Sequence, residues 1–131
     1  MTSTHLEVRY LPESKAPGHT PFSAADGVER AFKMLEGRWK LLILFHLFGE
    51  RPLRFSDLER AIPAISQKML IQQLRQMEKD GIVYRRVHNQ VPPKVEYGLT
   101  PWGQTLCPVV DGLLKWVARR PAAIESFVPG D

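Results

Sequence analysis

The sequence has very little cysteine: of its 131 residues, only Cys107 carries a thiol. One cysteine excludes an intramolecular disulfide and a zinc site built from several thiolates. We interpret Cys107 as a small buried apolar residue, because unpaired cysteines are commonly buried. The histidines do not show the close spacing of metal ligands; they are His5, His19, His46 and His88. The sequence therefore predicts no metal site and no disulfide framework.

Long apolar runs are also missing. The longest, residues 41–48, is interrupted by His46 and is less than half of the ~20 residues that a membrane span needs. The first ten residues mix acids and bases and lack the apolar segment of a secretory signal. We therefore expect no membrane association and a cytoplasmic location.

Patterns that carry catalysis are absent as well. The sequence shows no glycine-rich phosphate loop, no catalytic-triad pattern and no carboxylate pair with a plausible site. Its length suits one domain with tails, since single domains commonly have ~100–150 residues. That length excludes an enzyme with separate cofactor and substrate lobes. We expect no enzymatic activity and no cofactor.

The net charge of +4 is small, but it is concentrated. Residues 51–100 contain nine Lys or Arg against five Asp or Glu, while residues 1–25, 26–50 and 101–131 each contain equal numbers of both. The whole basic excess therefore lies in one fifty-residue segment. Such a local excess is a weak indication of a polyanionic partner.

Composition divides the chain into an arm, a domain and a tail. Residues 1–25 contain Pro12, Pro17 and Pro21 and few aliphatic side chains, so we expect a flexible N-terminal arm. Residues 121–131 have a similar composition and are expected to form a C-terminal tail. The domain is expected over residues 26–120.

Two helices are expected at the start of this domain. Val28, Ala31, Phe32 and Leu35 have the spacing of an amphipathic helix, which Gly37 would end. Residues 38–48 begin with Arg-Trp-Lys and continue as an almost unbroken apolar run, and a helix that is apolar on all sides is expected at the centre of a small bundle.

A helix-turn-helix follows. Ser56 and Glu59 have the spacing of a capping box, which would open a short helix. Residues 63–65 form the turn, and Ser66 is expected to cap a second helix that continues to Asp80. Leu70, Leu74 and Met77 give that helix an apolar stripe, and its opposite side carries Lys68, Gln72, Arg75 and Lys79. Two capped helices joined by a tight turn are typical of DNA-binding proteins.

A β-hairpin and a last helix complete the domain. Residues 82–87 are rich in β-branched side chains, and residues 94–99 alternate between apolar and other residues. The loop between them, residues 88–93, is polar and contains two prolines. Thr100 and Pro101 would start the last helix, with a kink at Pro108. We predict an α+β, mainly helical fold: a winged helix-turn-helix whose additional N- and C-terminal helices form a dimer interface.

Taken together, several short segments resemble the HxlR-type winged helix-turn-helix regulators over about residues 26–117. The segments are Val28–Ala31, Gly37–Trp39, Arg54–Leu58, Ile65–Leu70, Val91–Tyr97 and Leu99–Gly103. The resemblance implies a bacterial, homodimeric transcription regulator whose first and last core helices make the dimer. Members of that family often carry Cys-Pro before the Val-Glu-Arg segment, and in several the cysteine senses oxidants or electrophiles. Asp26 and Gly27 stand there instead, so thiol sensing at that site is not available to this chain.

The first turn of the second helix is expected to read bases. Gln67 and Lys68, with Gln72 one turn further, have side chains that pair with adenine or guanine edges in the major groove. Arg75 lies farther along and is expected to contact the backbone or to pair with an acid. A solvated outer face is the alternative interpretation, but the capped helix pair and the wing together favour DNA.

The hairpin tip is expected to contact phosphates or to enter the minor groove. Strand alternation places Arg85 and Arg86 on opposite faces, so at most one of them would point to DNA. Arg54 and Ser56 are further candidates for phosphate contacts, although Ser56 could be only a cap. A solvated hairpin edge is the alternative for the wing. The complete predicted DNA-binding set is Arg54, Ser56, Ser66, Gln67, Lys68, Gln72, Arg75, Arg86, His88, Asn89, Gln90 and Lys94.

The last helix has more apolar residues than one face needs to cover a small core. We interpret the surplus as a dimer seam, although the two tails could cover it instead. The predicted seam residues are Val28, Phe32, Leu106, Val110, Leu113 and Val117. Trp39 and Trp102 are expected to be core or seam anchors, and His46 a core histidine or a residue that lines an effector pocket.

The sequence thus predicts a sequence-specific DNA-binding transcriptional regulator that occupies a two-fold symmetric operator on double-stranded DNA as a homodimer. A repressor is expected, because a dimer this small has no separate activation domain. The alternative is a winged-helix module that binds a partner protein. The input is left open between a small-molecule effector in a pocket on the dimer side and no signal beyond expression level.

Overall fold

The computed structural model describes residues 21–49 and 51–122, with side chains from residue 23 onward. The chain divides into two units, residues 1–36 and residues 37–131. In the first unit the described residues form helix α2 (Pro21–Leu35). The helix starts within the expected arm, because proline fits the first turn of a helix, where no backbone N–H is needed. The expectation for residues 21–25 was therefore wrong, and residues 1–20 lie outside the described residues.

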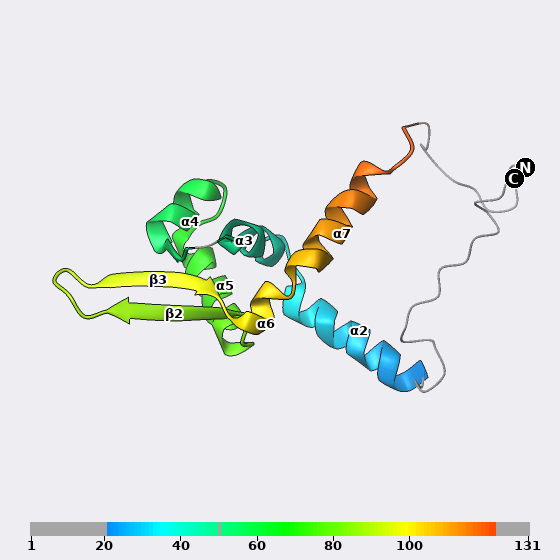
Figure 1. Ribbon diagram of the computed structural model, residues 1–131, viewed down its shortest axis with the longest axis horizontal. Helices are drawn as coiled ribbons and strands as arrows, with labels where there is room; N and C mark the ends of the chain where they lie inside the picture. Colours follow the sequence, from blue (N-terminus) through cyan, green and yellow to red (C-terminus); the bar gives the residue numbers. More distant parts are fainter. Residues whose placement is uncertain (1–20, 50, 123–131) are drawn as a thin grey trace, which may run out of the picture. The chain divides into compact units, whose positions relative to one another are not determined.

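The second unit contains the other helices and the sheet (Figure 1). In chain order they are α3 (Lys40–Leu47), β1 (Leu53–Arg54), α4 (Phe55–Ala61), α5 (Gln67–Lys79), β2 (Val83–His88), β3 (Lys94–Leu99), α6 (Pro101–Gln104) and α7 (Cys107–Ala118). This order confirms the mainly helical α+β fold and its winged helix-turn-helix. The domain expected over residues 26–120 is divided between Glu36 and Gly37. Of the expected tail, only residues 121 and 122 are described.

The core of this unit lies where α3, α4 and α5 meet the base of the sheet. Its fully buried side chains are Ile43, Leu44, Leu58, Leu70, Leu74, Met77, Ile82 and Val83. Burying a side chain of this size stabilises the fold by about 1.5–3 kcal/mol relative to leaving it exposed. The apolar stripe predicted for α5 is confirmed as its core face.

We expected helix α3 to be buried on all sides, but it is buried on one side only. Leu42 is 41% exposed and Phe45 is 51% exposed, while Ile43, Leu44 and Leu47 are buried. A short helix beside a small core has packing partners on one side only. The unbroken apolar run therefore gives α3 one core face and one exposed apolar face.

The sheet has three antiparallel strands in the order β1-β3-β2. The hairpin register pairs Val83 with Leu99 at its base and His88 with Lys94 near its tip. The hairpin extends beyond the helices (Figure 1), as the position of the polar loop predicts. Strand β1 adds the pairs Leu53–Tyr97 and Arg54–Glu96. It was not predicted, because two residues are too short to show alternation.

Thr100 joins the end of the hairpin to the end of α5. Its Oγ1 donates a hydrogen bond to the Gly81 carbonyl oxygen at 2.6 Å and accepts one from the Gly103 backbone N–H at 3.0 Å. Thr100 is the N-cap of α6 and Pro101 is its first residue, which confirms the predicted helix start. A Cβ atom at position 103 would overlap the Ile82 carbonyl oxygen. Glycine therefore permits the close approach of α6 to this backbone.

The last helix is broken, whereas the sequence predicts one helix with a kink. Helix α6 ends at Gln104, and α7 begins at Cys107. Pro108 has no N–H to donate, and its ring clashes with the carbonyl four residues earlier in a continuous helix, which is that of Gln104. The proline therefore separates two helices. Among the described helices, none is long and apolar enough to cross a membrane.

The close approach at Gly103 predicts a specific stability effect. Gly103→Ala should lower the free energy of unfolding by about 1–3 kcal/mol, because a methyl group there must displace backbone. Gly112→Ala is the matched control: it lies within α7 with nothing near its Cβ position, and it should raise stability by about 0.5–1 kcal/mol. Urea unfolding of both variants measures the difference. Equal changes in the free energy of unfolding for the two variants would contradict the close contact between Gly103 and the Ile82 carbonyl oxygen.

Candidate nucleic-acid interface

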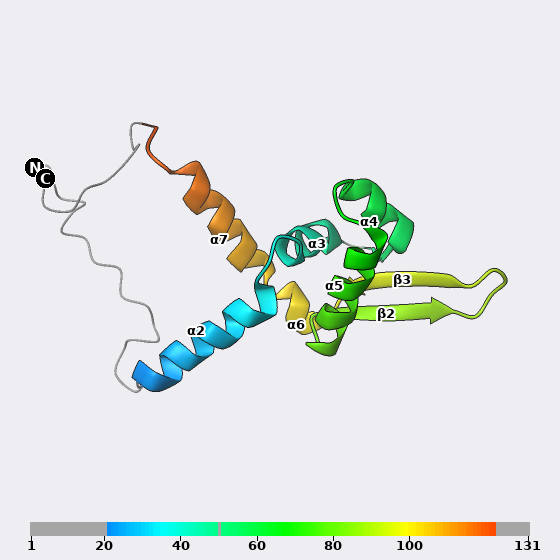
Figure 2. The same cartoon turned by 180° about the vertical axis from the view of Figure 1, so that it is seen from behind.

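Helix α5 presents a polar face to solvent. Ser66 caps it as predicted: its Oγ accepts a hydrogen bond from the Met69 backbone N–H at 3.1 Å. The side opposite the core is a shallow hollow of about 970 Å³ lined by Gln67, Lys68, Ile71, Gln72, Arg75, Gln76 and Lys79. The structure thus brings the predicted base readers Gln67, Lys68 and Gln72 together on one exposed surface of α5, the helix that Figure 2 shows from behind.

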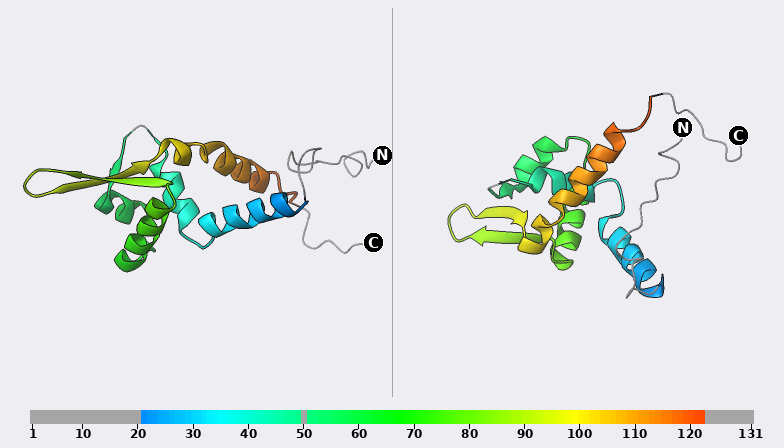
Figure 3. Two further views of the ribbon diagram at one scale, coloured as in Figure 1. Left: turned by 90° about the horizontal axis from the view of Figure 1, so that it is seen from below. Right: turned by 45° about the vertical axis from the view of Figure 1, so that its right-hand side comes forward.

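A second groove lies between α5 and the hairpin, and we call it the helix–wing groove. Its volume is about 530 Å³, and it is lined by Phe55, Ile71, Arg75, Glu78, Arg85, Val95 and Tyr97. The groove brings Arg75 of α5 together with Arg85 of β2. It also shows that Arg85, Val95 and Tyr97 belong to the face of the sheet that α5 covers (Figure 3).

Arg85 lines the helix–wing groove, and the sequence analysis did not single it out. Alternation predicts that Arg85 and Arg86 point to opposite faces. Which of them faces α5 depends on the side on which the helix packs, and that is a tertiary contact without a sequence signal. The predicted set contains Arg86, whereas the structure places Arg85 beside α5.

Arg86 belongs to the other side of the sheet, which we call the outer face. Its guanidinium carbon lies 5.5 Å from the centre of the Tyr84 ring, in a cation–π arrangement. Arg86 is also directly opposite Glu96, and so is Arg54 on the other neighbouring strand. Because directly paired residues of antiparallel strands share a face, these three side chains belong to the outer face. Arg54 and Arg86 are therefore separated from the base readers of α5.

Glu96 organises the outer face. Its Oε1 is 2.5 Å from Nε2 of His88, and its Oε2 is 3.6 Å from Nζ of Lys94. The hydrogen bond from His88 lowers the pKa of this carboxyl group and outweighs the opposing effect of burial, and the charge of Lys94 adds a smaller lowering. Two of the predicted DNA contacts are thus engaged by an acid within the wing. Sequence reasoning missed this pairing, because the distance from His88 to Glu96 depends on the register of the hairpin.

The tip of the wing is open. Asn89, Gln90, Pro92 and Pro93 are exposed, and Val91 is 99% exposed. The described contacts of this loop include a hydrogen bond from the Gln90 backbone N–H to the His88 carbonyl oxygen at 2.9 Å. The predicted tip residues are therefore accessible to a ligand.

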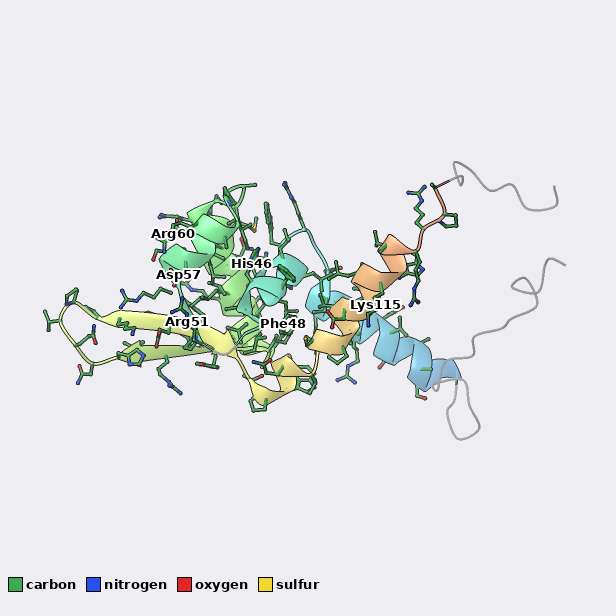
Figure 4. The ribbon with its side chains drawn as sticks, turned by 45° about the horizontal axis from the view of Figure 1, so that its top comes forward. His46, Phe48, Arg51, Asp57, Arg60 and Lys115 are labelled. Carbon is green, nitrogen blue, oxygen red and sulfur yellow. The ribbon has the colours of Figure 1, made fainter. Side chains whose placement is uncertain are left out.

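The start of α4 differs from the expected capping box. The helix begins at Phe55, and Asp57 accepts a hydrogen bond from the Arg54 backbone N–H at 2.8 Å. Asp57 also pairs with Arg60 at 2.6 Å (Figure 4). The box of Ser56 and Glu59 is not formed, because the helix starts earlier than those residues require. Arg54 and Ser56 are both exposed.

The predicted seam residues fall into two groups. Val28 and Phe32 on α2, and Leu113 and Val117 on α7, are exposed, and Leu106 is partly buried. Val110 is only 8% exposed and packs into the core of its own unit, so it does not belong to a free apolar face. The apolar side chains of α7 cover about half of its circumference, and the predicted set missed the exposed residues Val109, Leu114 and Trp116.

The remaining candidates are less buried than expected. Cys107 and His46 are both partly buried, and His46 makes an edge contact with the Phe45 ring at 5.2 Å between centroids. Arg38 stacks over Trp39 at 4.2 Å, and Trp102 is exposed. Within residues 21–49 and 51–122, the structure shows no group of three or more His, Cys, Asp or Glu residues placed to hold a metal ion.

Known proteins are similar to this chain in sequence and fold. Residues 34–124 match the model of the HxlR-like helix-turn-helix family. The HTH-type transcriptional regulator YtcD of Bacillus subtilis is 48% identical over 93 residues, which is 71% of this chain and 73% of YtcD. A transcriptional regulator of Methanothermobacter thermautotrophicus is 38% identical over 115 residues, which is 82% of this chain and 87% of that protein. The structure of the redox regulator HypR in its reduced form is 42% identical, with a TM-score of 0.70, and covers 77% of this chain and 99% of HypR.

The capping geometry predicts different roles for two serines. Ser66→Ala should lower the free energy of unfolding by about 1 kcal/mol, because the Met69 N–H loses its partner at the start of α5. Ser56→Ala should change it by less than about 0.5 kcal/mol, because this exposed hydroxyl does not cap α4. Denaturant unfolding of the two variants makes the comparison. If Ser56→Ala lost more stability than Ser66→Ala, the result would support the capping box of Ser56 and Glu59 and contradict the structure.

Proposed function

Because the chain belongs to the HxlR-like helix-turn-helix family of transcriptional regulators, we propose that it binds a two-fold symmetric DNA operator as a homodimer and represses transcription there. The observation that carries the proposal is the exposed polar face of α5 beside a groove with two arginines. An α-helix of this kind fits the major groove.

On this proposal the first turns of α5 read base edges. Gln67 and Gln72 offer the amide groups that pair with adenine, and Lys68 offers a donor for the acceptors of guanine. All three side chains line one hollow, so they can contact neighbouring base pairs in the same stretch of major groove. Ser66 holds the start of the helix, where the free N–H groups and the helix dipole favour a phosphate.

The helix–wing groove is suited to the DNA backbone. Arg75 and Arg85 supply positive charge from its two walls, and Val95 and Tyr97 supply an apolar floor against which a sugar can pack. Contacts of this kind position a protein on the duplex without reading sequence. The exposed tip would then follow the backbone into the adjacent minor groove, with Asn89 and Gln90 available for polar contacts.

The exposed apolar side chains of α7 support the homodimer. Leu113, Leu114, Trp116 and Val117 on this one helix are 45% to 73% exposed. A patch of this kind on a protein that acts in water marks an interface. A two-fold dimer would place two recognition helices about 34 Å apart, one turn of DNA. Helix α2, with its exposed Val28 and Phe32, offers a second apolar strip for the same purpose.

Repression and location follow from the same parts. The exposed polar face of α5 and the exposed apolar side chains of α7 support this proposal, since occupancy of an operator by a dimer is enough to block transcription. We place the protein in the cytoplasm with the DNA that it binds.

A small-molecule effector bound on the dimer side remains part of the proposal, and a thermal-shift screen of metabolites would test it.

Selection of bound duplexes from a random DNA pool tests the function. We expect enrichment of a two-fold symmetric motif, and a logarithm of the binding constant that falls steeply with the logarithm of salt concentration. No enriched motif and a flat salt response would instead favour a winged helix that binds a partner protein.

Variants of the two surfaces should then separate base reading from backbone binding. Lys68→Ala should weaken operator binding by about 1–3 kcal/mol and leave non-specific DNA nearly unchanged. Arg85→Ala should weaken all sequences alike and reduce the salt slope by about 1. Arg86→Ala should act in the same direction but less, because its guanidinium lies over Tyr84 on the outer face. Filter binding at several salt concentrations measures all three. Unchanged affinity in every variant would overturn the site assignment.

The seam predicts a change in oligomeric state. Leu113→Glu combined with Val117→Glu should weaken the dimer about a hundredfold or more, since unpaired carboxylates buried in an interface cost several kcal/mol. Lys115→Glu, on the polar side of the same helix, is the control and should leave the dimer intact. Sedimentation velocity gives both dissociation constants. A native protein that sediments as a monomer at every concentration would contradict the dimer.

A further inference from the structure

The outer face of the wing gathers basic side chains around one carboxylate. The residues directly opposite Glu96 are Arg54 on β1 and Arg86 on β2. His88 and Lys94 lie within 3.6 Å of its two oxygens. Among the described strand residues, Glu96 is the sole acid, because β1 and β2 carry none and β3 carries no other. A face that would otherwise be strongly positive therefore has a negative centre.

The carboxylate is also well placed to hold its partners. Its side chain is only 14% exposed, whereas those of His88 and Lys94 are 34% and 31% exposed. Charges shielded from water interact through a lower effective dielectric constant and are screened less by salt. The pairs of Glu96 are therefore stronger than those of two fully exposed side chains.

We propose that Glu96 limits the sequence-independent part of DNA binding, by holding His88 and Lys94 against itself and away from DNA phosphates. The inference rests on the proposed function, because it concerns the same wing and the same ligand. Glu96 acts through its neighbours and is a positioning residue; it does not contact DNA.

The physical basis is the release of counterions. Each phosphate that a protein cation neutralises adds about 0.9 to the steepness with which the binding constant falls with salt. A lysine that is already paired with a carboxylate neutralises no phosphate and contributes little to that slope. Phosphate contacts carry no sequence information, so cations released from Glu96 would strengthen binding to any duplex. Non-specific sites compete with the operator, and a restrained wing reduces that competition.

Glu96→Gln tests the proposal, because it removes the charge and keeps the shape. Binding to a non-specific duplex should be measured by fluorescence anisotropy across a salt series at constant pH. We expect the release of Lys94 to make the slope steeper by about 0.9 per wing, and to raise the affinity on the order of fivefold per wing at 0.15 M salt. Asp111→Asn on α7 is the control: it changes the net charge equally, far along the chain from the wing, and should leave the slope unchanged.

A double-mutant cycle with Lys94→Gln makes the test specific. In the native background this change should leave the slope nearly unaltered, because Glu96 already engages Lys94. In the Glu96→Gln background the same Lys94→Gln change should reduce the steepness of the salt dependence by about 0.9 per wing. A merely structural role for Glu96 would change the melting temperature of the variants without this dependence on background. The Lys94→Gln measurement in native protein remains informative even if Glu96→Gln does not fold.

Two results would overturn the proposal. In the first, the salt dependence of binding by Glu96→Gln is equal to that of the native protein or shallower. In the second, Lys94→Gln alone, with Glu96 present, reduces the salt dependence by the full contribution of one lysine, about 0.9 per wing. The second result would show that Lys94 binds phosphate while Glu96 is present. Failure of the proposed function looks different: the native protein would bind no duplex in a salt-dependent manner, and no operator would be enriched from the random pool.

Discussion

The burial of one side of α5 is the constraint on which the candidate interface depends. Leu70, Leu74 and Met77 are almost completely shielded from water, so the rotation of the helix about its own axis is fixed. A helix rotated by half a turn would place these side chains in water, at a cost of several kcal/mol. The side chains that alternate with them along the helix must then face outward. The outward position of the predicted base readers is in this sense a consequence of core packing.

The same helix fixes the position of the wing. The chain leaves α5 through Gly81, which has a positive φ of 81°, and the Ile82 N–H donates a hydrogen bond to the Met77 carbonyl oxygen at 3.0 Å. Thr100 then ties the far end of the hairpin back to Gly81. Both ends of the hairpin are therefore held at the end of α5, and Gly103 lets α6 close over that junction. The distance between recognition helix and wing is set by backbone contacts, which leaves the outward side chains free to vary.

The sequence predicted the features that depend on local patterns and missed those that depend on which elements meet. The period of Leu70, Leu74 and Met77, the cap at Ser66 and the start at Thr100 are local, and the structure confirms them. The capping box failed because Asp57 takes the role predicted for Glu59, and a difference of two residues in the helix start decides between them. Strand β1 was not predicted, and the break before Pro108 was predicted as a kink within one helix. Each depends on short segments whose conformation is set by neighbours.

The candidate site shows the same division more sharply. Alternation predicted that Arg85 and Arg86 face opposite sides, but only the packing of α5 identifies Arg85 as the residue of the helix–wing groove. Spacing predicted Val110 as a seam residue, yet it is 8% exposed whereas Trp116 of the same helix is 73% exposed, because only one side of α7 meets the core.

The concentration of basic residues in one segment has a different meaning once the register is known. Counting Lys and Arg along residues 51–100 treats every cation as available. The structure divides them: Lys68, Arg75 and Arg85 lie on or beside α5, whereas Arg60 is paired with Asp57 and Lys94 with Glu96. An acid placed across a strand or one turn along a helix cancels a charge that a linear count still includes. The basic side chains left without an acidic partner in the described part of the chain are therefore fewer than the sequence indicates, and they include Lys68 and Arg75 on the face of α5 and Arg85 in the groove beside it, which Glu78 also lines.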